Sequence, residues 1–215
     1  MEKNVSQNTM TILQNMTLFL IGISFSLASC ATNASKEKVF IDSIPTDTTR
    51  LFISSTKELK TNHIPDSIFN MTDLTVLYLA GSDCDLGITN DDSKDTIGCW
   101  MIKEIPKKIG NLKKLIELTL SLNAIKEIPE EIKQLKSLKI LDLTDNTGIT
   151  NIDNITSLTT LQTLNLFGCG LTSLPKNIGN LKRLKQLGLT GNNISEKELK
   201  RLQQELPNCD IIYRQ

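Results

Sequence analysis

The sequence predicts an α/β solenoid, in which short repeats stack into a curved parallel sheet on a concave face, with irregular, 3-10 or short helical connectors on the convex face. Two observations predict this fold. Aliphatic residues recur every 23 positions through the second half of the chain, and aromatic residues make up only 4% of the 215 residues. A hydrophobic set this uniform favours one repeated packing unit. The last residues, 195–215, have the pattern of a helix followed by a strand, which predicts a cap over the final repeat.

The N-terminal segment predicts export. Residues 18–28 form an apolar run that is shorter than the roughly 20 residues needed to span a bilayer. The run matches the hydrophobic region of a secretory signal. It ends in Leu27-Ala28-Ser29-Cys30, which resembles the lipobox of bacterial lipoproteins. That resemblance implies a signal peptide over 1–29, a lipidated Cys30 and a flexible tether over 30–39. An ordinary cleaved signal and a cytosolic protein are the two alternative interpretations.

Strand motifs recur in register along the rest of the chain. Four motifs of the form L-x-x-L-x-L-x-x-N, with Cys for Asn in the third, begin at Leu115, Leu138, Leu161 and Leu184. A further motif begins at Leu74, and residues 50–54 fit a degenerate first repeat or an N-terminal cap. The pattern resembles the leucine-rich repeat. This resemblance implies a domain over 40–215 with about five or six repeats and a binding role.

The connectors between strand motifs follow a second aliphatic pattern. Pro106, Pro129 and Pro175 each follow an aliphatic residue of that pattern. Proline fixes φ and lacks an N–H, so these connectors are not expected to be regular helices. In the third repeat the proline is absent and the Ile residues over 149–155 are spaced by three, which predicts a 3-10 turn.

The C-terminal cap is predicted from its own signals. Ser195-x-x-Glu198 is a capping box at the start of a helix. Leu199, Leu202 and Leu206 then recur at helical spacing. The apolar run over 211–213 can add a last strand to the sheet.

One repeat carries an insertion near residues 82–99. Its two cysteines, Cys84 and Cys99, are predicted to form a disulfide in an oxidising compartment, closing a loop of about 15 residues and contributing about 3 kcal/mol in the chain-entropy model. The loop is also rich in Asp, which makes calcium an alternative. The EF-hand pattern fails, because Thr96 and Ile102 occupy the positions of its Gly and Glu. A solvated acidic loop is therefore the default, and no metal site is predicted.

The outward positions of the strands are the candidate partner-binding residues. Tyr78, Ile140 and Phe167 offer apolar anchors, and Glu117 and Asp142 add negative charge. No Lys or Arg occurs among these positions, which argues against a phosphate or nucleic-acid ligand. The alternative is a tolerated scaffold surface, since scattered exposed apolar residues are normal. The predicted partner-binding set is Val76, Tyr78, Glu117, Thr119, Ile140, Asp142, Thr163, Asn165, Phe167 and Gln186.

Basic residues gather at another place in the repeat. Lys113, Lys136 and Lys182 recur two positions before a strand motif, with Lys114 and Arg183 beside two of them. They are expected to form a charged ridge at the edge of the sheet or on the connector side. Such a ridge can meet anionic lipid headgroups, or it can simply keep the solenoid soluble.

The sequence predicts a binding protein rather than an enzyme. His63 is the only histidine, no glycine-rich phosphate loop occurs, and the net charge is zero, so no catalytic site, cofactor or nucleic-acid partner is predicted. The leading hypothesis is an exported lipoprotein, anchored in the outer membrane or at the cell surface, that binds a protein or else a glycan. An intracellular leucine-rich repeat adaptor is one alternative, because the connector from Ile105 to Leu112 is similar to that of such scaffolds. A structural envelope protein without a specific ligand is the other.

Overall fold

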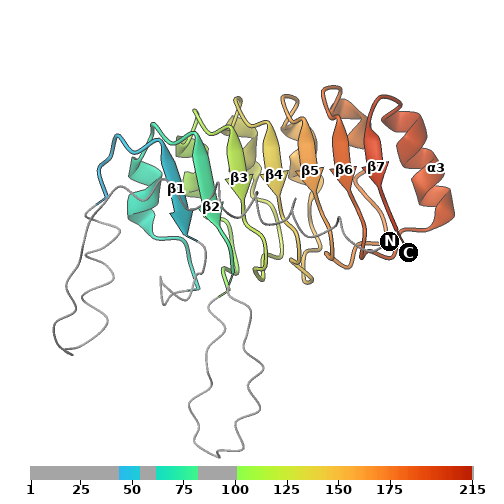
Figure 1. Ribbon diagram of the computed structural model, residues 1–215, viewed down its shortest axis with the longest axis horizontal. Helices are drawn as coiled ribbons and strands as arrows, with labels where there is room; N and C mark the ends of the chain where they lie inside the picture. The colour runs from blue at the N-terminus through green and yellow to red at the C-terminus, as the bar shows by residue number, and fades with distance from the viewer. Residues whose placement is uncertain (1–43, 54–61, 82–100, 215) are drawn as a thin grey trace, which may run out of the picture. The chain divides into compact units, whose positions relative to one another are not determined.

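The computed structural model describes residues 44–53, 62–81 and 101–214, which all belong to one compact unit over residues 34–215. Seven parallel strands pair in sequence order to form a single sheet (Figure 1). Each strand occupies the same place in its repeat, so the sheet grows by one strand per repeat. The strands are β1 (Arg50–Ile53), β2 (Val76–Leu79), β3 (Glu117–Thr119), β4 (Ile140–Asp142), β5 (Thr163–Asn165), β6 (Gln186–Gly188) and β7 (Asp210–Ile212).

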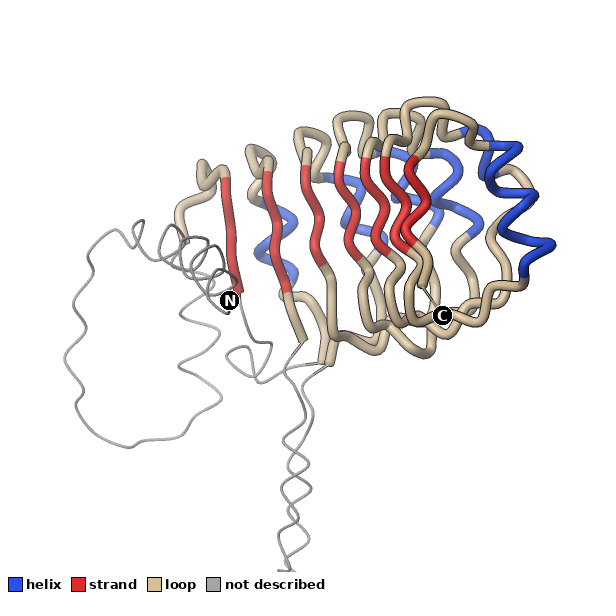
Figure 2. The backbone as a smooth tube through the Cα atoms, turned by 45° about the vertical axis from the view of Figure 1, so that its right-hand side comes forward, coloured by secondary structure: helices blue, strands red, loops and turns tan. Residues whose placement is uncertain are grey.

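The connectors run along the side of the unit opposite the strands (Figure 2). They contain short 3-10 helices, as the connector pattern predicts. Pro65, Pro106 and Pro129 each stand at the N-cap of one of them. The third repeat, which lacks the proline, forms the expected 3-10 helix as well, with Ile152 at the N-cap position. The loss of the proline therefore does not change the fold of this connector. The five are η2 (Asp66–Asn70), η3 (Lys107–Asn111), η4 (Glu130–Gln134), η5 (Asp153–Ser157) and η6 (Ile178–Asn180).

The core lies between the strand layer and the connector layer. Leu118, Leu141, Leu164 and Leu187 stack in register across β3 to β6, and all are fully buried. The aliphatic residues of the connectors meet them from the other side and belong to the same cluster. One repeat alone cannot cover its apolar side, so the stacking of neighbours stabilises the unit cumulatively. The predicted fold class is confirmed.

Asparagines at the end of the strand motif join neighbouring repeats. Asn146 is fully buried. Its amide nitrogen donates to the carbonyl oxygens of Leu143 at 2.8 Å and Leu120 at 2.9 Å, and its Oδ1 accepts from the Ile125 N–H at 3.0 Å. Asn123 and Asn192 make the corresponding bonds. Cys169, at the equivalent position, donates from its thiol to the Leu143 carbonyl at 3.2 Å.

The two ends of the insertion are connected through one of these asparagines. Asn123 donates to the Leu79 carbonyl at 3.0 Å and accepts from the Ile102 N–H at 2.9 Å. These two partners lie before and after residues 82–100. Cys84, Cys99 and the acidic positions between them lie outside the described residues, so the disulfide and calcium hypotheses stay predictions.

The C-terminal cap consists of α3 (Glu196–Glu205) and β7, as predicted from the sequence. Ser195 accepts a hydrogen bond from the Glu198 N–H at 3.2 Å, which is one half of the expected capping box. The other half of the prediction, a hydrogen bond from the Ser195 N–H to the Glu198 carboxylate, is wrong. The Glu198 carboxylate accepts instead from the Leu174 N–H at 2.9 Å, a residue 24 positions earlier, and so ties the helix to the preceding repeat.

Candidate binding surface

The outward side chains of the seven strands form one surface, which we call the strand face. The register places two rows on it. The first row is Arg50, Val76, Glu117, Ile140, Thr163, Gln186 and Asp210, and the second is Phe52, Tyr78, Thr119, Asp142, Asn165, Gly188 and Ile212. Nine of the ten predicted partner-binding residues therefore lie side by side in these two rows, and Phe167 follows the end of β5.

Two of the predicted residues are not exposed. Val76 is 8% exposed and Thr119 is 6% exposed, so the expectation that they present their side chains to a partner is wrong. Val76 lies between the longer side chains of Arg50 and Glu117 in its row. Thr119 lies between Tyr78 and Asp142. Short side chains between long neighbours lose their access to solvent.

The strand face also contains an aromatic residue that the sequence analysis missed. Phe52 on β1 is 55% exposed. Its ring centroid lies 6.0 Å from that of Tyr78, and the Arg50 guanidinium carbon lies 5.5 Å from the Phe52 centroid. The signal was the alternation of buried Leu51 and Ile53 with outward Arg50 and Phe52. It was overlooked because the first repeat lacks the complete motif.

The acidic residue at the centre of the strand face is held by neighbouring groups. Asp142 Oδ1 accepts from the Thr144 N–H at 2.9 Å, and Oδ2 accepts from the Asn165 side-chain amide at 3.2 Å. Part of the hydrogen-bonding capacity of Asp142 therefore serves the turn after β4 and the contact with β5. A ligand that used this carboxylate would have to share it with these partners.

A shallow depression of about 460 Å³ lies on the strand face near the ends of the last strands. Phe167 and Ile212 provide apolar lining, Gly168 and Gly191 leave room, and Arg214 brings a positive charge. Arg50 and Arg214 thus give the strand face cationic side chains at its two ends, which the sequence analysis did not include. The outward positions of β2 to β6 between these two residues carry no Lys or Arg.

Phe167 owes its position to the glycine beside it. A Cβ atom on Gly188 would lie 2.3 Å from Phe167 Cζ, so the ring rests where a side chain of β6 would otherwise be. Phe167 is consequently half-buried. Its face toward the sheet is packed and the rest is available on the strand face.

Gly188→Ala is expected to displace the Phe167 ring and lower the free energy of unfolding by about 1–2 kcal/mol, the usual cost of overpacking. In a Phe167→Ala background the same substitution should cost at least about 1 kcal/mol less, because the clash is gone. Urea unfolding of the four proteins in this double-mutant cycle measures the difference. Gly148→Ala is the control, since nothing lies within 4 Å of its Cβ position. Additive effects of the two substitutions would contradict the contact.

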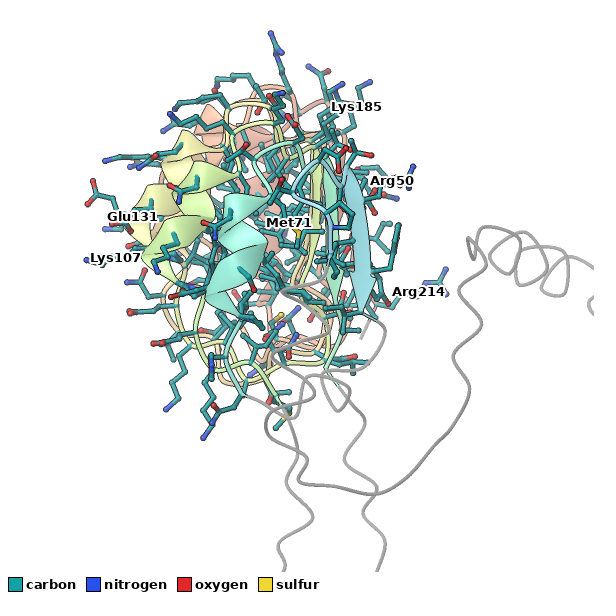
Figure 3. The ribbon with its side chains drawn as sticks, turned by 90° about the vertical axis from the view of Figure 1, so that its left-hand side faces the viewer. Arg50, Met71, Lys107, Glu131, Lys185 and Arg214 are labelled. Carbon is teal, nitrogen blue, oxygen red and sulfur yellow. The ribbon has the colours of Figure 1, made fainter. Side chains whose placement is uncertain are left out.

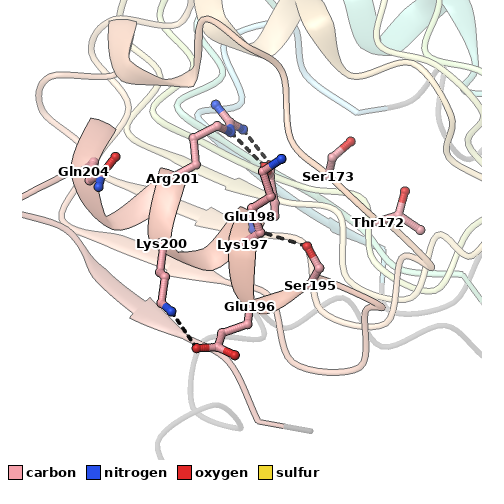
Figure 4. A pocket seen from close by; sticks show the side chains of 9 residues that line it. All are labelled: Thr172, Ser173, Ser195, Glu196, Lys197, Glu198, Lys200, Arg201 and Gln204. Atoms are coloured by element: carbon pink, nitrogen blue, oxygen red, sulfur yellow. Dashed lines mark hydrogen bonds and ion pairs between the residues drawn. The ribbon is translucent and has the colours of Figure 1, made fainter.

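A second depression, of about 800 Å³, lies where α3 meets the preceding connector (Figure 4). Four of its charged side chains form ion pairs, Lys200 with Glu196 and Arg201 with Glu198. Arg201 donates to Glu198 at 2.6 and 2.8 Å, to Glu205 at 2.8 Å and to the Leu174 carbonyl at 3.1 Å. The hydrogen bond from Arg201 lowers the pKa of Glu198 below 4.5. This network fastens the cap, and a charged ligand here would have to break it.

Arg201→Met is expected to lower the free energy of unfolding by about 1–2 kcal/mol at neutral pH, because Glu198 and Glu205 lose their charged donor and keep only backbone donors. The pKa of Glu198 is lowered in the folded protein, so its contribution is full above about pH 4.5 and is lost as pH falls through the folded pKa. The difference between the two proteins should therefore shrink toward pH 3. Urea unfolding across this pH range measures it. Lys200→Met, which breaks an exposed pair with Glu196, should cost less than about 0.5 kcal/mol.

The described residues contain neither a cluster of metal ligands nor a helix that could span a bilayer. Within 44–53, 62–81 and 101–214, no three His, Cys, Asp or Glu side chains come together as metal ligands would. In the same ranges, no helix has the length and apolar character that crossing a bilayer requires. Burial raises the pKa values of the Cys169 and Cys209 thiols to about 11, which leaves both as poor nucleophiles at neutral pH. Cys30 lies outside these ranges.

Stacked parallel strands, 3-10 connectors and buried asparagines at the strand ends define a solenoid class of protein that presents an extended surface to partners. The leucine-rich repeat region family matches residues 96–212, more than half of the chain. The chain belongs to the leucine-rich repeat family. Regions of this family act as protein-interaction scaffolds, and they are generally not catalytic.

Solved structures agree with this assignment. A leucine-rich repeat protein of Leptospira interrogans is 27% identical, with a TM-score of 0.51 over 79% of this chain and 51% of that one. The internalin inlF of Listeria monocytogenes is 18% identical, with a TM-score of 0.54 over 79% of this chain and 44% of that one, a likeness of fold alone. This chain thus spans about half the length of these structures. No curated relative matches the sequence.

Proposed function

We propose that this chain is an exported, membrane-anchored surface lipoprotein whose leucine-rich repeat domain binds a partner protein on the strand face. One observation carries the binding role. Phe52, Tyr78, Ile140, Phe167 and Ile212 distribute apolar side chains along one sheet face from β1 to β7. Aromatic and aliphatic anchors on a rigid framework are the groups that dominate protein-binding energy.

Site-specific photo-cross-linking tests the strand face. A photoreactive phenylalanine analogue placed at Phe52 and, separately, at Phe167 is expected to capture the same partner protein in cells. The same analogue at Lys133, on the connector side, is the control and should not capture it. Equal capture from all three positions, or none from the first two, would remove the strand face as the binding site.

The captured partner then allows a quantitative test. Tyr78→Ala, Ile140→Ala and Phe167→Ala together should weaken its binding by at least about tenfold, because these side chains are the apolar anchors. A matched control combines Lys107→Ala, Lys126→Ala and Lys133→Ala on connector residues, all exposed. Titration calorimetry with the purified partner measures both, and an unchanged Kd for the first variant would refute the anchors.

The proposed lipid anchor rests on the sequence Leu27-Ala28-Ser29-Cys30. A thiol at the first mature position can carry a diacylglycerol, and each buried CH₂ adds about 0.8 kcal/mol to membrane affinity. Growth with radioactive fatty acid should label the wild-type protein and a Cys209→Ala control, but not Cys30→Ala. Unchanged labelling of Cys30→Ala would exclude the anchor. Recovery of unlabelled, full-length wild-type protein from the cytosol would favour the adaptor alternative.

A further inference from the structure

Seven basic side chains lie along the edge of the sheet where the strands begin. All seven are exposed. The Gln162 N–H donates to the Lys139 carbonyl and the Lys185 N–H to the Gln162 carbonyl, which aligns the starts of β4, β5 and β6. In Figure 3, Lys185 lies where the strands begin and Arg214 lies where they end. We call this set the basic edge: Lys113, Lys114, Lys136, Lys139, Lys182, Arg183 and Lys185.

The basic edge differs from the connector side in how its charges are satisfied. Among the described connector lysines, Lys107 pairs with Glu131, Lys108 with Asp66 and Lys133 with Glu130, whereas Lys126 forms no ion pair. Within the described part of the chain, only Lys114 of the basic edge forms an ion pair, with Asp73 at 2.5 Å. A surface that only needs to be soluble intersperses both signs. The connector side fits that description and the basic edge does not.

Few acids offset the basic edge. Besides Asp73, the acidic residues near the strand starts are Asp47 before β1, Glu117 at the first position of β3 and Asp210 at the first position of β7. Seven cations against these four leave the edge net positive on a chain whose total charge is zero. Neither of the two depressions described above includes a residue of the basic edge. The basic edge is therefore suited to an extended anionic surface rather than to one small anion.

The chain reaches the sheet at this same edge. Because all strands are parallel, the residues before Arg50 enter β1 from the side on which the basic edge lies. Only residues 31–43 separate Cys30 from the first described residue, Ile44. Thirteen residues span at most about 45 Å when fully extended. A membrane that holds Cys30 would thus lie within reach of the basic edge.

We infer that the basic edge rests on the anionic phospholipid headgroups of the membrane to which the chain is anchored. The choice of membrane rests on the proposed lipid anchor. The attraction to anionic lipid rests on the basic edge alone. Clustered Lys and Arg near a bilayer are attracted by anionic lipids over about one Debye length. With the basic edge on the bilayer, the strands run away from the membrane surface, and the strand face stays open to a partner.

Vesicle flotation of the unlipidated mature chain, residues 30–215 with Cys30→Ala, tests this inference without the anchor. Every described element lies within the compact unit 34–215, so this chain keeps all strands and connectors. It should bind vesicles of phosphatidylcholine with about 30% phosphatidylglycerol but not phosphatidylcholine alone. Binding should weaken by at least about tenfold between about 50 and 300 mM salt, as screening requires.

Two matched variants locate the contact. Lys136→Gln, Lys139→Gln, Lys182→Gln and Lys185→Gln together should abolish flotation, whereas Lys107→Gln, Lys108→Gln, Lys126→Gln and Lys133→Gln should preserve it. Circular dichroism confirms that both remain folded. Equal loss in the two variants, or no binding of the parent chain to anionic vesicles, would overturn the inference. Binding to heparin without binding to anionic vesicles would also overturn it in favour of a polyanionic chain. None of these outcomes bears on the labelling of Cys30 or on cross-linking from the strand face.

Discussion

Asn146→Ala should lower the free energy of unfolding by about 2–4 kcal/mol, because the side chain serves three backbone groups inside the core. The substitution leaves the Ile125 N–H without its partner in a fully buried site. It also removes one of the two side-chain donors from the Leu120 carbonyl, which keeps Asn123, and from the Leu143 carbonyl, which keeps Cys169. Each buried polar group that loses its partner costs about 1–3 kcal/mol, and neighbouring costs do not simply add. Urea unfolding followed by circular dichroism measures the change.

Two controls separate hydrogen bonding from side-chain volume at this position. Asn193→Ala removes an exposed asparagine and should change the free energy of unfolding by less than about 0.5 kcal/mol. Cys169→Ala, at the equivalent position of the next repeat, removes a weak thiol donor and should cost less than Asn146→Ala. A similar cost for Asn146→Ala and Cys169→Ala would contradict the role of the amide.

Gly81→Ala should also be strongly destabilising, by about 3 kcal/mol or more. A Cβ atom on Gly81 would lie 1.4 Å from the Leu122 carbonyl oxygen, a separation that no movement of a side chain can relieve. Leu122 itself has φ 57°, in the left-handed region, so its backbone has little freedom to move away. Thermal and urea unfolding measure the loss.

The control for Gly81 is again Gly148→Ala, because Gly148 has open space around its Cβ position. The Gly81 N–H donates to the Ser121 carbonyl at 2.8 Å, which fixes the chain leaving β2 onto the turn after β3. A Gly81→Ala protein as stable as the Gly148→Ala protein would mean that this turn is not held closely.

The strand order and register were predictable because they follow from a fixed spacing. Leu118, Leu141, Leu164 and Leu187 recur 23 residues apart, and equal spacing forces equivalent residues into equivalent places. The inward Asn146 was predictable for the same reason. The cap helix was predictable from local signals alone, since Leu202 and its neighbours recur at helical spacing.

Other features depend on which residues meet across repeats. The Glu198 carboxylate accepts from the Leu174 N–H, because folding brings the preceding connector against the cap helix. The burial of Thr119 depends on the length of Tyr78 and Asp142 on adjacent strands. Phe52 joined the strand face because β1 pairs with β2 in register, although its repeat lacks the full motif.

The sequence by itself determined that this chain is a leucine-rich repeat solenoid, since one aliphatic period dictates both what is buried and how the repeats stack. Only the tertiary structure decided which outward side chains are accessible and which charges are paired. It also decided that the recurring lysines lie where the strands begin. Exposure and charge pairing depend on neighbours one or more repeats away, and a linear pattern gives the spacing of such neighbours but not their contacts.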